Sequence, residues 1–296
     1  MLYANDLSLC VAGDVTVVQY ADDTQILVSG KKRDLKHLVT RMEAALSSMY
    51  QWFCQNGMKL NAQKTKMLVI GTPAMLRDMP HVTINFCGAS IPDSKVVQNL
   101  GLSMDRHLNY QSHIDVLSRK CTGILLALSH ARHVMPRSAL KIVIEALVFS
   151  IVRYCLSIYG SCGKVQIHRV QKIINFAARV VTGRRRFDHI SESVEQLGWF
   201  TAEKLVEYHT ATAVNRVVST GLPANIRMSI GPRASEVHVH NTRNANLWTL
   251  PAIRSETGRR RLCYRGVLLI NRLGVEPGGS HFRQQLRAAL NVSDTD

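Results

Sequence analysis

Two adjacent carboxylates, Asp22 and Asp23, stand between two short β-branched runs and are well suited to metal chemistry. Hard divalent cations such as Mg²⁺ bind carboxylate oxygens and usually keep water and substrate phosphates as their other ligands. Two such cations about 3.5–4 Å apart can activate an attacking oxygen and stabilise a leaving one, as nucleotidyl transfer onto a 3′-hydroxyl requires. A structural alternative stays open, because aspartate is also favoured in turns, where its side chain bonds the nearby backbone.

The residues around this pair favour the chemical interpretation. Residues 15–20 and 24–28 are short β-branched segments around a polar link, which predicts a β-hairpin with Asp22 and Asp23 at its tip. A tight turn between two strands would hold the carboxylates at a fixed place. The small Ala21 beside them would let a primer end approach closely.

The rest of the first hundred residues predict a mixed α and β region. A helix is expected over residues 34–56, because its apolar residues recur at the i, i+3, i+4, i+7 spacing, with Asp34 as N-cap and Gly57 just past its end. Residues 64–71 predict a strand, residues 82–92 a hairpin around Cys87-Gly88, and residues 96–105 a strand and turn.

From about residue 113 the apolar spacing becomes helical. One helix is expected to begin there, a second at Pro136, a third to end at Gly183, and a fourth to run over residues 201–220. Such amphipathic helices with short connections indicate a bundle. The face expected to be buried in the second helix consists of Val143, Ala146, Leu147, Ser150, Ile151 and Tyr154. Beyond Gly221 the chain holds 11 arginines, no lysine and five acidic residues, and predicts a loop-rich region with short helices near 264–272 and 281–290.

The charge of the chain points to an anionic partner. Lysine and arginine number 37 against 21 acidic residues, a formal net charge of +16. Nucleic acid is the leading candidate, because contacts of basic side chains with phosphates release counterions and supply affinity that needs no base sequence. A membrane surface is the rival partner, although no apolar run is long enough to span a bilayer and no signal peptide is recognisable.

The seven scattered cysteines form no CxxC pair and predict no disulfide framework. A reducing, intracellular location is therefore expected, either nuclear or cytoplasmic. Cys155, Cys162 and His168 could be imagined as zinc ligands, but their spacing matches no standard site. Nothing in the sequence predicts an oligomeric state.

An ordered series of motifs gives the hairpin a family context. The chain resembles the C-terminal part of a reverse transcriptase from a non-LTR (LINE-type, jockey-like) retrotransposon. Tyr20-Ala21-Asp22-Asp23 is similar to the polymerase C motif, and residues 2–7 resemble the stretch that precedes it. Residues 57–61 with Lys64-Thr65 resemble the D motif, and Asn99-Leu100-Gly101 with Asp105 resembles the E motif. Residues 168–172 with Asn175 and Arg179 resemble the thumb, and residues 241–243, 258–260 and 264–266 resemble the C-terminal tail of the family. A viral RNA-dependent RNA polymerase is a closer rival than other classes, but such enzymes usually have glycine at the position of Ala21.

The resemblance implies roles for individual residues of the first part of the chain. Asp22 would be the principal ligand of a catalytic Mg²⁺ (or Mn²⁺), Asp23 would support it, and Tyr20 would pack near the primer end. Lys64 would stand near the leaving pyrophosphate, a role for which Lys66 competes. Gln98, Asn99, Leu100 and Gly101 would hold the primer strand. The implied partners are an RNA template, a DNA primer and deoxynucleoside triphosphates.

A second group of residues is expected to contact nucleic acid from the helical part. This group consists of Arg169, Lys172, Arg179, Arg184, Arg185 and Arg186. Its binding should depend on shape and charge and should weaken steeply with salt. Cations near a helix C-terminus are also favoured by the helix dipole, so a structural explanation of the cluster remains open.

The family's A motif, which supplies another metal-binding aspartate, is expected upstream of Met1, and Asp6 and Asp14 lie too close to the hairpin to replace it. We therefore expect no primer extension from this chain alone. The expected fold is α+β: a partial polymerase palm over 1–105 with a hairpin carrying the catalytic turn, a mostly helical thumb and connection over 106–220, and an arginine-rich C-terminal region over 221–296. The expected function is that of an RNA-directed DNA polymerase fragment, part of a larger protein that could also hold an endonuclease. A catalytically dead retroelement remnant and a basic nucleic-acid-binding module are the alternatives.

Overall fold

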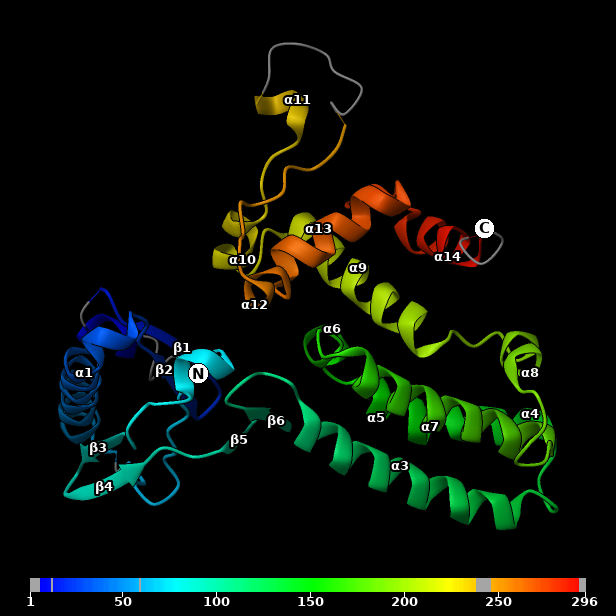
Figure 1. Cartoon of the computed structure of the whole chain (residues 1–296), viewed down its shortest axis with the longest axis horizontal. Helices are drawn as coiled ribbons and strands as arrows, with labels where there is room; N and C mark the ends of the chain where they lie inside the picture. The colour runs from blue at the N-terminus through cyan, green and yellow to red at the C-terminus, as the bar shows by residue number, and fades with distance from the viewer. Residues whose placement is uncertain (1–5, 12, 59, 238–245, 293–296) are drawn as a thin grey trace. The chain divides into compact units, whose positions relative to one another are not determined.

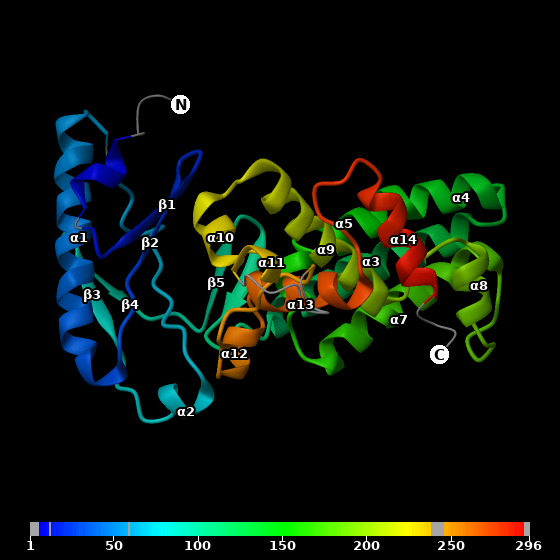
Figure 2. The same cartoon turned by 90° about the horizontal axis from the view of Figure 1, so that it is seen from above.

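The structure is a computed structural model, and it describes all residues except 1–5, 12, 59, 238–245 and 293–296 (Figures 1 and 2). The sequence segments 2–5, Lys59 and 241–243, which carry part of the family resemblance, lie outside the described residues. The chain divides into two compact units, residues 1–107 and residues 108–296. Helices and small antiparallel strand pairs make up the described fold, which confirms the expected α+β class.

The first unit is built around the hairpin that carries Asp22 and Asp23. Strand β1 (Thr16–Tyr20) pairs antiparallel with β2 (Asp23–Leu27), and Tyr20 and Asp23 form the last pair before the turn. Helix α1 (Leu35–Gln55) lies behind it. Side chains of one hairpin face, Val17 and Ile26, pack with Ala45 and Met49 of α1 in a small apolar core. This core fixes the hairpin to the helix through one face and leaves the opposite face outward.

Helix α1 ends as the sequence predicts. Asn56 is its C-cap and Gly57 has φ +67°, a left-handed conformation that glycine adopts without a steric penalty. The Gly57 amide donates to the Cys54 carbonyl at 3.1 Å, and the Met58 amide donates to the Phe53 carbonyl at 2.8 Å. These two bonds define a Schellman motif, which satisfies carbonyls that the helix end leaves unpaired.

Two further hairpins complete the first unit. Strand β3 (Thr83–Phe86) pairs with β4 (Ala89–Pro92), and β5 (Val96–Asn99) pairs with β6 (Leu102–Asp105). The turn of the first holds Cys87 and Gly88 and that of the second Leu100 and Gly101, all with positive φ, as two-residue hairpin turns of type I′ require. Ile84, Phe86 and Ile91 pack with Leu46 of α1.

The prediction of a strand over residues 64–71 is wrong. Residues 62–64 form a turn, the short helix α2 (Pro73–Leu76) follows, and only Met67 makes a single parallel bridge, to Asp93. The Ser94 amide donates to the Met67 carbonyl at 2.8 Å, whereas the Gly71 amide donates to the Arg106 carbonyl at 3.0 Å. Because the segment bonds to two different neighbours, it forms no continuous ladder, although Met67, Leu68 and Val69 are half-buried.

The second unit begins with helices that pack side by side. Helix α3 (Gln111–Ala131) lies against α7 (Lys164–Thr182), and between them in sequence come α4 (Arg137–Ile144), a π-helical turn (Glu145–Phe149), α5 (Ser150–Arg153) and α6 (Leu156–Tyr159) (Figure 1). The buried stripes predicted for α3 and α7 are confirmed.

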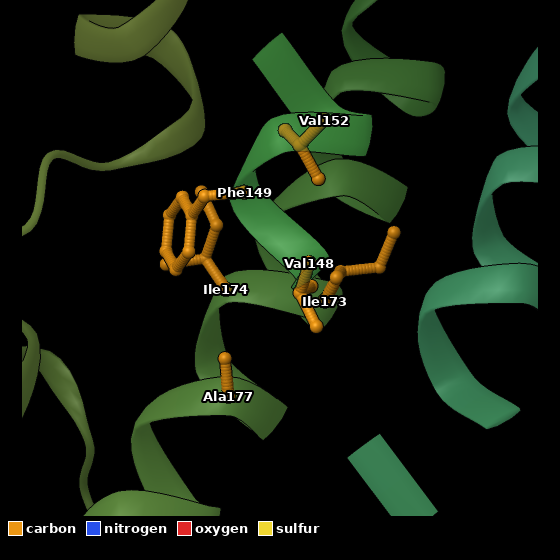
Figure 3. A pocket seen from close by; sticks show the side chains of 6 residues that line it. All are labelled: Val148, Phe149, Val152, Ile173, Ile174 and Ala177. Carbon is orange, nitrogen blue, oxygen red and sulfur yellow. The ribbon is translucent and has the colours of Figure 1, made fainter. Parts of the chain in front are cut away.

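The predicted buried face of the second helix is wrong. Leu140, Ile144, Val148, Phe149 and Val152 are buried, whereas Ala146, Leu147, Ser150 and Tyr154 are exposed. The π-helical turn inserts an extra residue into the helical repeat, so no single 3.6-residue phase fits both sides of it. Figure 3 shows the result: Val148, Phe149 and Val152 meet the α7 side chains Ile173, Ile174 and Ala177 around an apolar hollow with no room for a water molecule. This contact belongs to the core and is not a ligand site.

The remaining elements continue the same unit. They are α8 (Ser191–Gln196), α9 (Ala202–Thr220), α10 (Ala224–Ser229), α11 (Ala234–Val237), α12 (Glu256–Arg259), α13 (Leu262–Leu273) and α14 (Phe282–Val292). Val214 and Val217 of α9 share one apolar core with Val267 and Ile270 of α13 and with Leu286 of α14. Helices α13 and α14, which lie in the arginine-rich region beyond residue 220, therefore bury apolar side chains against α9.

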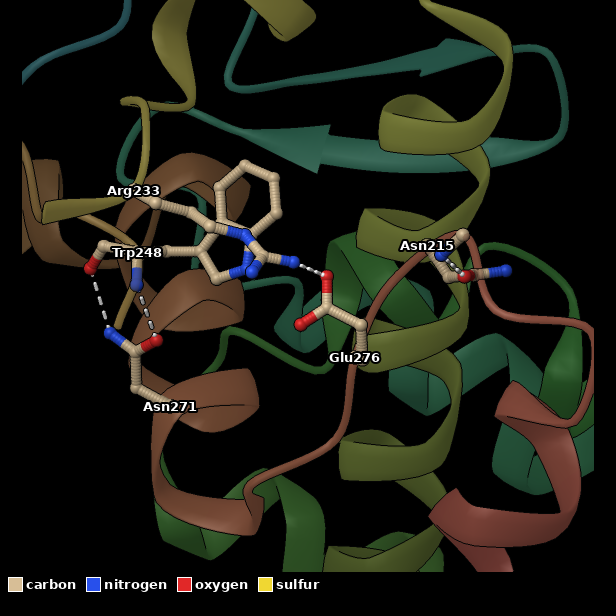
Figure 4. Close-up of polar contacts among 6 residues, drawn as sticks. Asn215, Arg233, Trp248, Asn271 and Glu276 are labelled. Carbon is tan, nitrogen blue, oxygen red and sulfur yellow. Dashed lines mark hydrogen bonds and ion pairs between the residues drawn. The ribbon is translucent and has the colours of Figure 1, made fainter. Parts of the chain in front are cut away.

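Polar contacts hold the irregular segments of this part in place (Figure 4). The Asn271 side chain accepts from the Trp248 amide at 3.0 Å and donates to its carbonyl at 2.8 Å. Arg233 pairs with Glu276 and lies over the Trp248 ring, and the Gly278 amide donates to Asn215 Oδ1 at 2.7 Å. Loop segments on either side of α13 are thus tied to α9 and α13 rather than left free.

Candidate active site

The Tyr20–Asp23 turn is a two-residue link with an unusual backbone. Ala21 has φ +55°, and Asp22 is the second residue of the link, while Asp23 already pairs with Tyr20 as the first residue of β2. A left-handed conformation costs a residue with a Cβ about 1–2 kcal/mol. Such conformations gather at functional sites, where the surrounding structure holds them in place. The hairpin ladder and its contact with α1 supply that support here.

All four residues of the turn are exposed, and the Tyr20 side chain retains 65% of its accessible surface. Among the described residues, neither the Asp22 nor the Asp23 carboxylate has a hydrogen-bond or ion-pair partner. Both carboxylates are therefore available to a cation or a ligand from outside. Tyr20 and Asp23 share the outward hairpin face with Gln25, because strand partners lie on the same side of the sheet.

The two carboxylates fit a divalent cation only in part. Mg²⁺ accepts one or two protein carboxylates and completes its shell with water and phosphate oxygens. The described part of the chain contains no group of three or more His, Cys, Asp or Glu side chains placed to share a metal ion. Asp22 and Asp23 can therefore contribute to a two-metal site but do not form one by themselves.

Asp6 and Asp14 are engaged elsewhere, as their sequence position suggested. Asp14 pairs with Arg41 of α1, and Asp6 accepts from the Trp52 indole at 3.4 Å. Asp14 precedes β1, so it stands at the end of the hairpin opposite the turn, roughly 17 Å away along a five-residue strand. At that separation Asp14 cannot join Asp22 at one metal ion.

The residues predicted to contact the primer lie at the tip of the β5–β6 hairpin. Gln98, Leu100 and Gly101 are exposed, and Asn99 is half-buried. Gln25 Nε2 of β2 donates to Asn99 Oδ1 at 2.9 Å. The structure thus connects the hairpin with the carboxylates to the hairpin with the predicted primer contacts. Gln25 was not singled out from the sequence, because a polar residue in a half-exposed strand carries no signal by itself.

Lys64 lies in a turn and not in a strand. Its amide donates to Asn61 Oδ1 at 3.2 Å, and its side chain is exposed. Within the described chain no ion pair joins the ammonium group of Lys64 or Lys66 to Asp22 or Asp23. The structure does not bring either lysine together with the carboxylates, and the proposed role of Lys64 stays a prediction.

The basic residues of the second unit fall into two groups. Arg169 pairs with Asp115 of α3 at 2.6 Å, and Arg179 donates to the carbonyls of Arg185 and Asp188, both at 3.2 Å. These two side chains hold the packing of α7 and the loop that follows it. Lys172, Arg184, Arg185 and Arg186 are exposed. Contact of both groups with nucleic acid stays a prediction. The exposed side chains are more accessible to a nucleic acid than Arg169 and Arg179 are.

The cysteines and histidines of the second unit form no metal centre in the described residues. Burial raises the pKa of Cys121 and of Cys162 to about 11, and burial also raises the pKa of Cys155. Thiols with raised pKa values remain protonated near neutral pH and are poor nucleophiles and metal ligands. Cys121 is a buried core residue, and Cys155 and Cys162 are half-buried.

Comparison with known proteins places the first unit in a family. Residues 2–104 match the family model of reverse transcriptase (RNA-dependent DNA polymerase). The chain is 24% identical over 203 residues to the probable RNA-directed DNA polymerase from transposon BS of Drosophila melanogaster, an alignment that covers 67% of this chain and 22% of that protein. It is 22% identical over 175 residues to the RNA-directed DNA polymerase from mobile element jockey of the same organism, covering 57% of this chain and 18% of the relative. A 115 kDa protein of the type-1 retrotransposable element R1DM is 28% identical over 110 residues, covering 37% of this chain and 10% of the relative.

The resemblance to retrotransposon reverse transcriptases is therefore confirmed. The family model covers the first unit, and the similarity to the relatives extends beyond it. The chain spans about a fifth of the length of the relatives it matches. No solved structure matches it. In the described residues no helix is long and apolar enough to cross a membrane.

Proposed function

We propose that this chain is the C-terminal part of an RNA-directed DNA polymerase of a non-LTR retrotransposon. The observation that carries the proposal is the exposed Asp22-Asp23 pair on a braced hairpin within the segment that matches reverse transcriptases. In this role residues 1–105 form the end of the polymerase palm. The helices over 106–220 act as thumb and connection, and the arginine-rich residues 221–296 extend them.

Asp22 and Asp23 would hold Mg²⁺ or Mn²⁺ at the outward tip of the hairpin. The bound metal supplies activation of the primer 3′-hydroxyl and neutralisation of the leaving pyrophosphate. The chain itself orients the carboxylates, through the strained Ala21 turn and the packing of Val17 and Ile26 against α1. The substrates are deoxynucleoside triphosphates, with an RNA template and a DNA primer.

The primer strand would contact Tyr20 on the first hairpin and residues 98–101 on the β5–β6 hairpin. The Gln25–Asn99 hydrogen bond supports this assignment, because it couples the two hairpins on the face that carries Tyr20 and Asp23. Lys172 and Arg184, Arg185 and Arg186 would contact the phosphates of the product duplex from the second unit, with Arg169 and Arg179 beside them.

These 296 residues alone should not extend a primer. The described residues bring only two carboxylates to the turn, and two-metal chemistry needs further ligands. The same observation favours the alternative of a basic nucleic-acid-binding chain without catalysis. The purified chain is expected to bind nucleic acid but to show no Mg²⁺-dependent extension of a DNA primer on an RNA template.

A chimera separates the two functions. The chain would be joined to the upstream polymerase region of the jockey relative, and extension on an RNA template would be measured. Asp22→Asn is expected to lower the rate of extension at least 100-fold and to leave template–primer affinity unchanged. Asp78→Asn removes an equally exposed charge elsewhere in the first unit and serves as the control. An active Asp22→Asn chimera would contradict the proposed role of the turn.

A further inference from the structure

The loop between α7 and α8 presents an aromatic ring among arginines. Residues 184–187 read Arg184-Arg185-Arg186-Phe187, and Phe187 retains 91% of its accessible surface. It is the most exposed of the large apolar side chains in the described residues. A single exposed apolar residue is common on protein surfaces and needs no explanation by itself. Phe187 differs from such residues because three arginines directly precede it in a loop.

The loop is a braced turn. The Asp188 amide donates to the Arg185 carbonyl at 3.2 Å, which closes a four-residue turn with Arg186 and Phe187 at its two central positions. The Asp188 carboxylate accepts from the Arg185 amide at 2.8 Å, and the Arg179 guanidinium donates to the carbonyls of Arg185 and Asp188, both at 3.2 Å. The three of these bonds that involve Arg185 use its backbone atoms, so they leave its side chain uninvolved.

The two central side chains lie together. The guanidinium carbon of Arg186 is 5.7 Å from the centre of the Phe187 ring, a cation–π distance. Arg184 and Arg185, which precede them in the sequence, are also exposed. The turn therefore presents an apolar ring against one guanidinium, and two more exposed arginines directly precede this pair in the sequence. The carboxylate of Asp188 accepts a hydrogen bond from the loop backbone.

We propose that this turn is a stacking site for an unpaired base of a single-stranded RNA. The ring of Phe187 would cover one base. Arg184, Arg185 and Arg186, which the proposed function assigns to the duplex, would then contact phosphates where the unpaired strand leaves that duplex. Aromatic side chains stack on any base, and basic side chains follow the backbone, so such a site binds single strands without sequence preference. The inference rests on the proposed function, which supplies an RNA template with an unpaired stretch beside its duplex.

A membrane surface is the other partner that arginines beside an exposed aromatic ring can suit. The observations favour RNA. Stable attachment to a lipid surface needs a broad apolar face or a second anchoring signal, whereas this turn offers one ring on a braced backbone. Stacking of one base needs one aromatic ring that an RNA strand can reach.

The test uses the full chain with fluorescein-labelled 12-nucleotide single-stranded RNA and a blunt 12-base-pair RNA duplex, followed by fluorescence anisotropy. Phe187→Ala should weaken binding of the single strand about 5- to 150-fold and leave duplex binding nearly unchanged. Phe187→Trp should retain the affinity, and its added indole fluorescence should be quenched by the bound strand. Val134→Ala, which shortens an equally exposed apolar side chain outside the basic run, should have no effect.

Several outcomes would overturn the inference. Phe187→Leu with wild-type affinity would show that an apolar contact suffices without stacking, and an equal loss for single strand and duplex would show a general effect on the loop. If Phe187→Ala lost binding to anionic phospholipid vesicles and kept its RNA affinity, the turn would be a lipid contact. If the wild-type chain binds no RNA, this inference and the nucleic-acid role of the second unit both fail. If Phe187→Ala behaves as wild type while the Asp22→Asn chimera is inactive, only the stacking site fails.

Discussion

Gln25 on β2 donates a hydrogen bond of 2.9 Å to Asn99 on β5, and this bond joins two hairpins that lie 74 residues apart in sequence. Gln25 precedes Ile26, which faces the α1 core, and lies two residues after Asp23 in β2. The bond therefore ties the outward face of the hairpin that carries Asp22 and Asp23 to the tip of the predicted primer-binding hairpin. In the proposed function, such a link would keep the primer end in register with the carboxylates.

Removing this bond should loosen both hairpins. Gln25→Leu and Asn99→Leu each delete one partner of a part-buried bond, whose net contribution is about 0.5–1.5 kcal/mol. Amide hydrogen exchange of β2 and β5 should therefore become about 2- to 10-fold faster in either variant. The double variant should exchange no faster than the single ones, because the pair interaction is already lost. Additive effects would show that the two side chains act independently.

The strained turn residue makes a second prediction. Ala21→Gly removes the steric penalty of φ +55° and should slow the opening of the β1–β2 hairpin, since only Ala21 of the Tyr20–Asp23 segment has positive φ. Ala21→Val should have the opposite effect, because a β-branched side chain tolerates this conformation poorly. Hydrogen exchange of the β1 and β2 amides measures both. If Ala21→Gly opens the hairpin faster, the backbone freedom of glycine outweighs the relief of strain.

Sequence patterns predicted most of the first unit because its signals are local. The hairpin pairs, the α1 stripe and the Gly57 end each depend on residues close together in the chain, and the structure has all three. The contacts between distant segments could not be predicted. Residues 64–71 resemble a strand in composition, but Met67 and Gly71 bond to different neighbours, and only the tertiary structure determines that.

The same distinction holds in the second unit. The apolar stripe of α7 from Val170 to Val181 has a constant period and was predicted correctly. The π-helical turn at Glu145–Phe149 shifts the phase of its helix, and the predicted buried face of that helix was therefore wrong. Phe187 was missed for another reason. Its significance comes from exposure and from a turn braced by Arg179, and an arginine run followed by phenylalanine does not reveal either.

The Arg169–Asp115 pair allows the two roles of Arg169 to be distinguished. The side chains retain 33% and 43% of their accessible surface, so the pair itself should contribute little to stability, about 0–1 kcal/mol. Asp115→Asn removes a negative charge and frees the guanidinium. If Arg169 contacts nucleic acid, the slope of log K against log salt for duplex binding should become steeper by up to about 0.9.

That measurement needs duplex affinities at several salt concentrations. Asp78→Asn, which removes an exposed charge from the first unit, is the control and should leave the slope unchanged. An unchanged slope in Asp115→Asn, together with unchanged binding in Arg169→Gln, would leave Arg169 with a structural role only.

Two helical glycines make a matched test of packing in the second unit. A Cβ at Gly266 of α13 would stand 2.4 Å from Val214 Cγ2 of α9, whereas a Cβ at Gly123 of α3 would meet nothing within 4 Å. Alanine is favoured over glycine in a helix by about 0.8–1 kcal/mol. Gly123→Ala should therefore raise the free energy of unfolding by about that amount. Gly266→Ala should lower it by about 1–3 kcal/mol, because the branched Val214 side chain is buried and has little freedom to move. Urea unfolding followed by far-UV circular dichroism measures both, and a stabilising Gly266→Ala would show that α9 and α13 do not pack as closely as the structure has them.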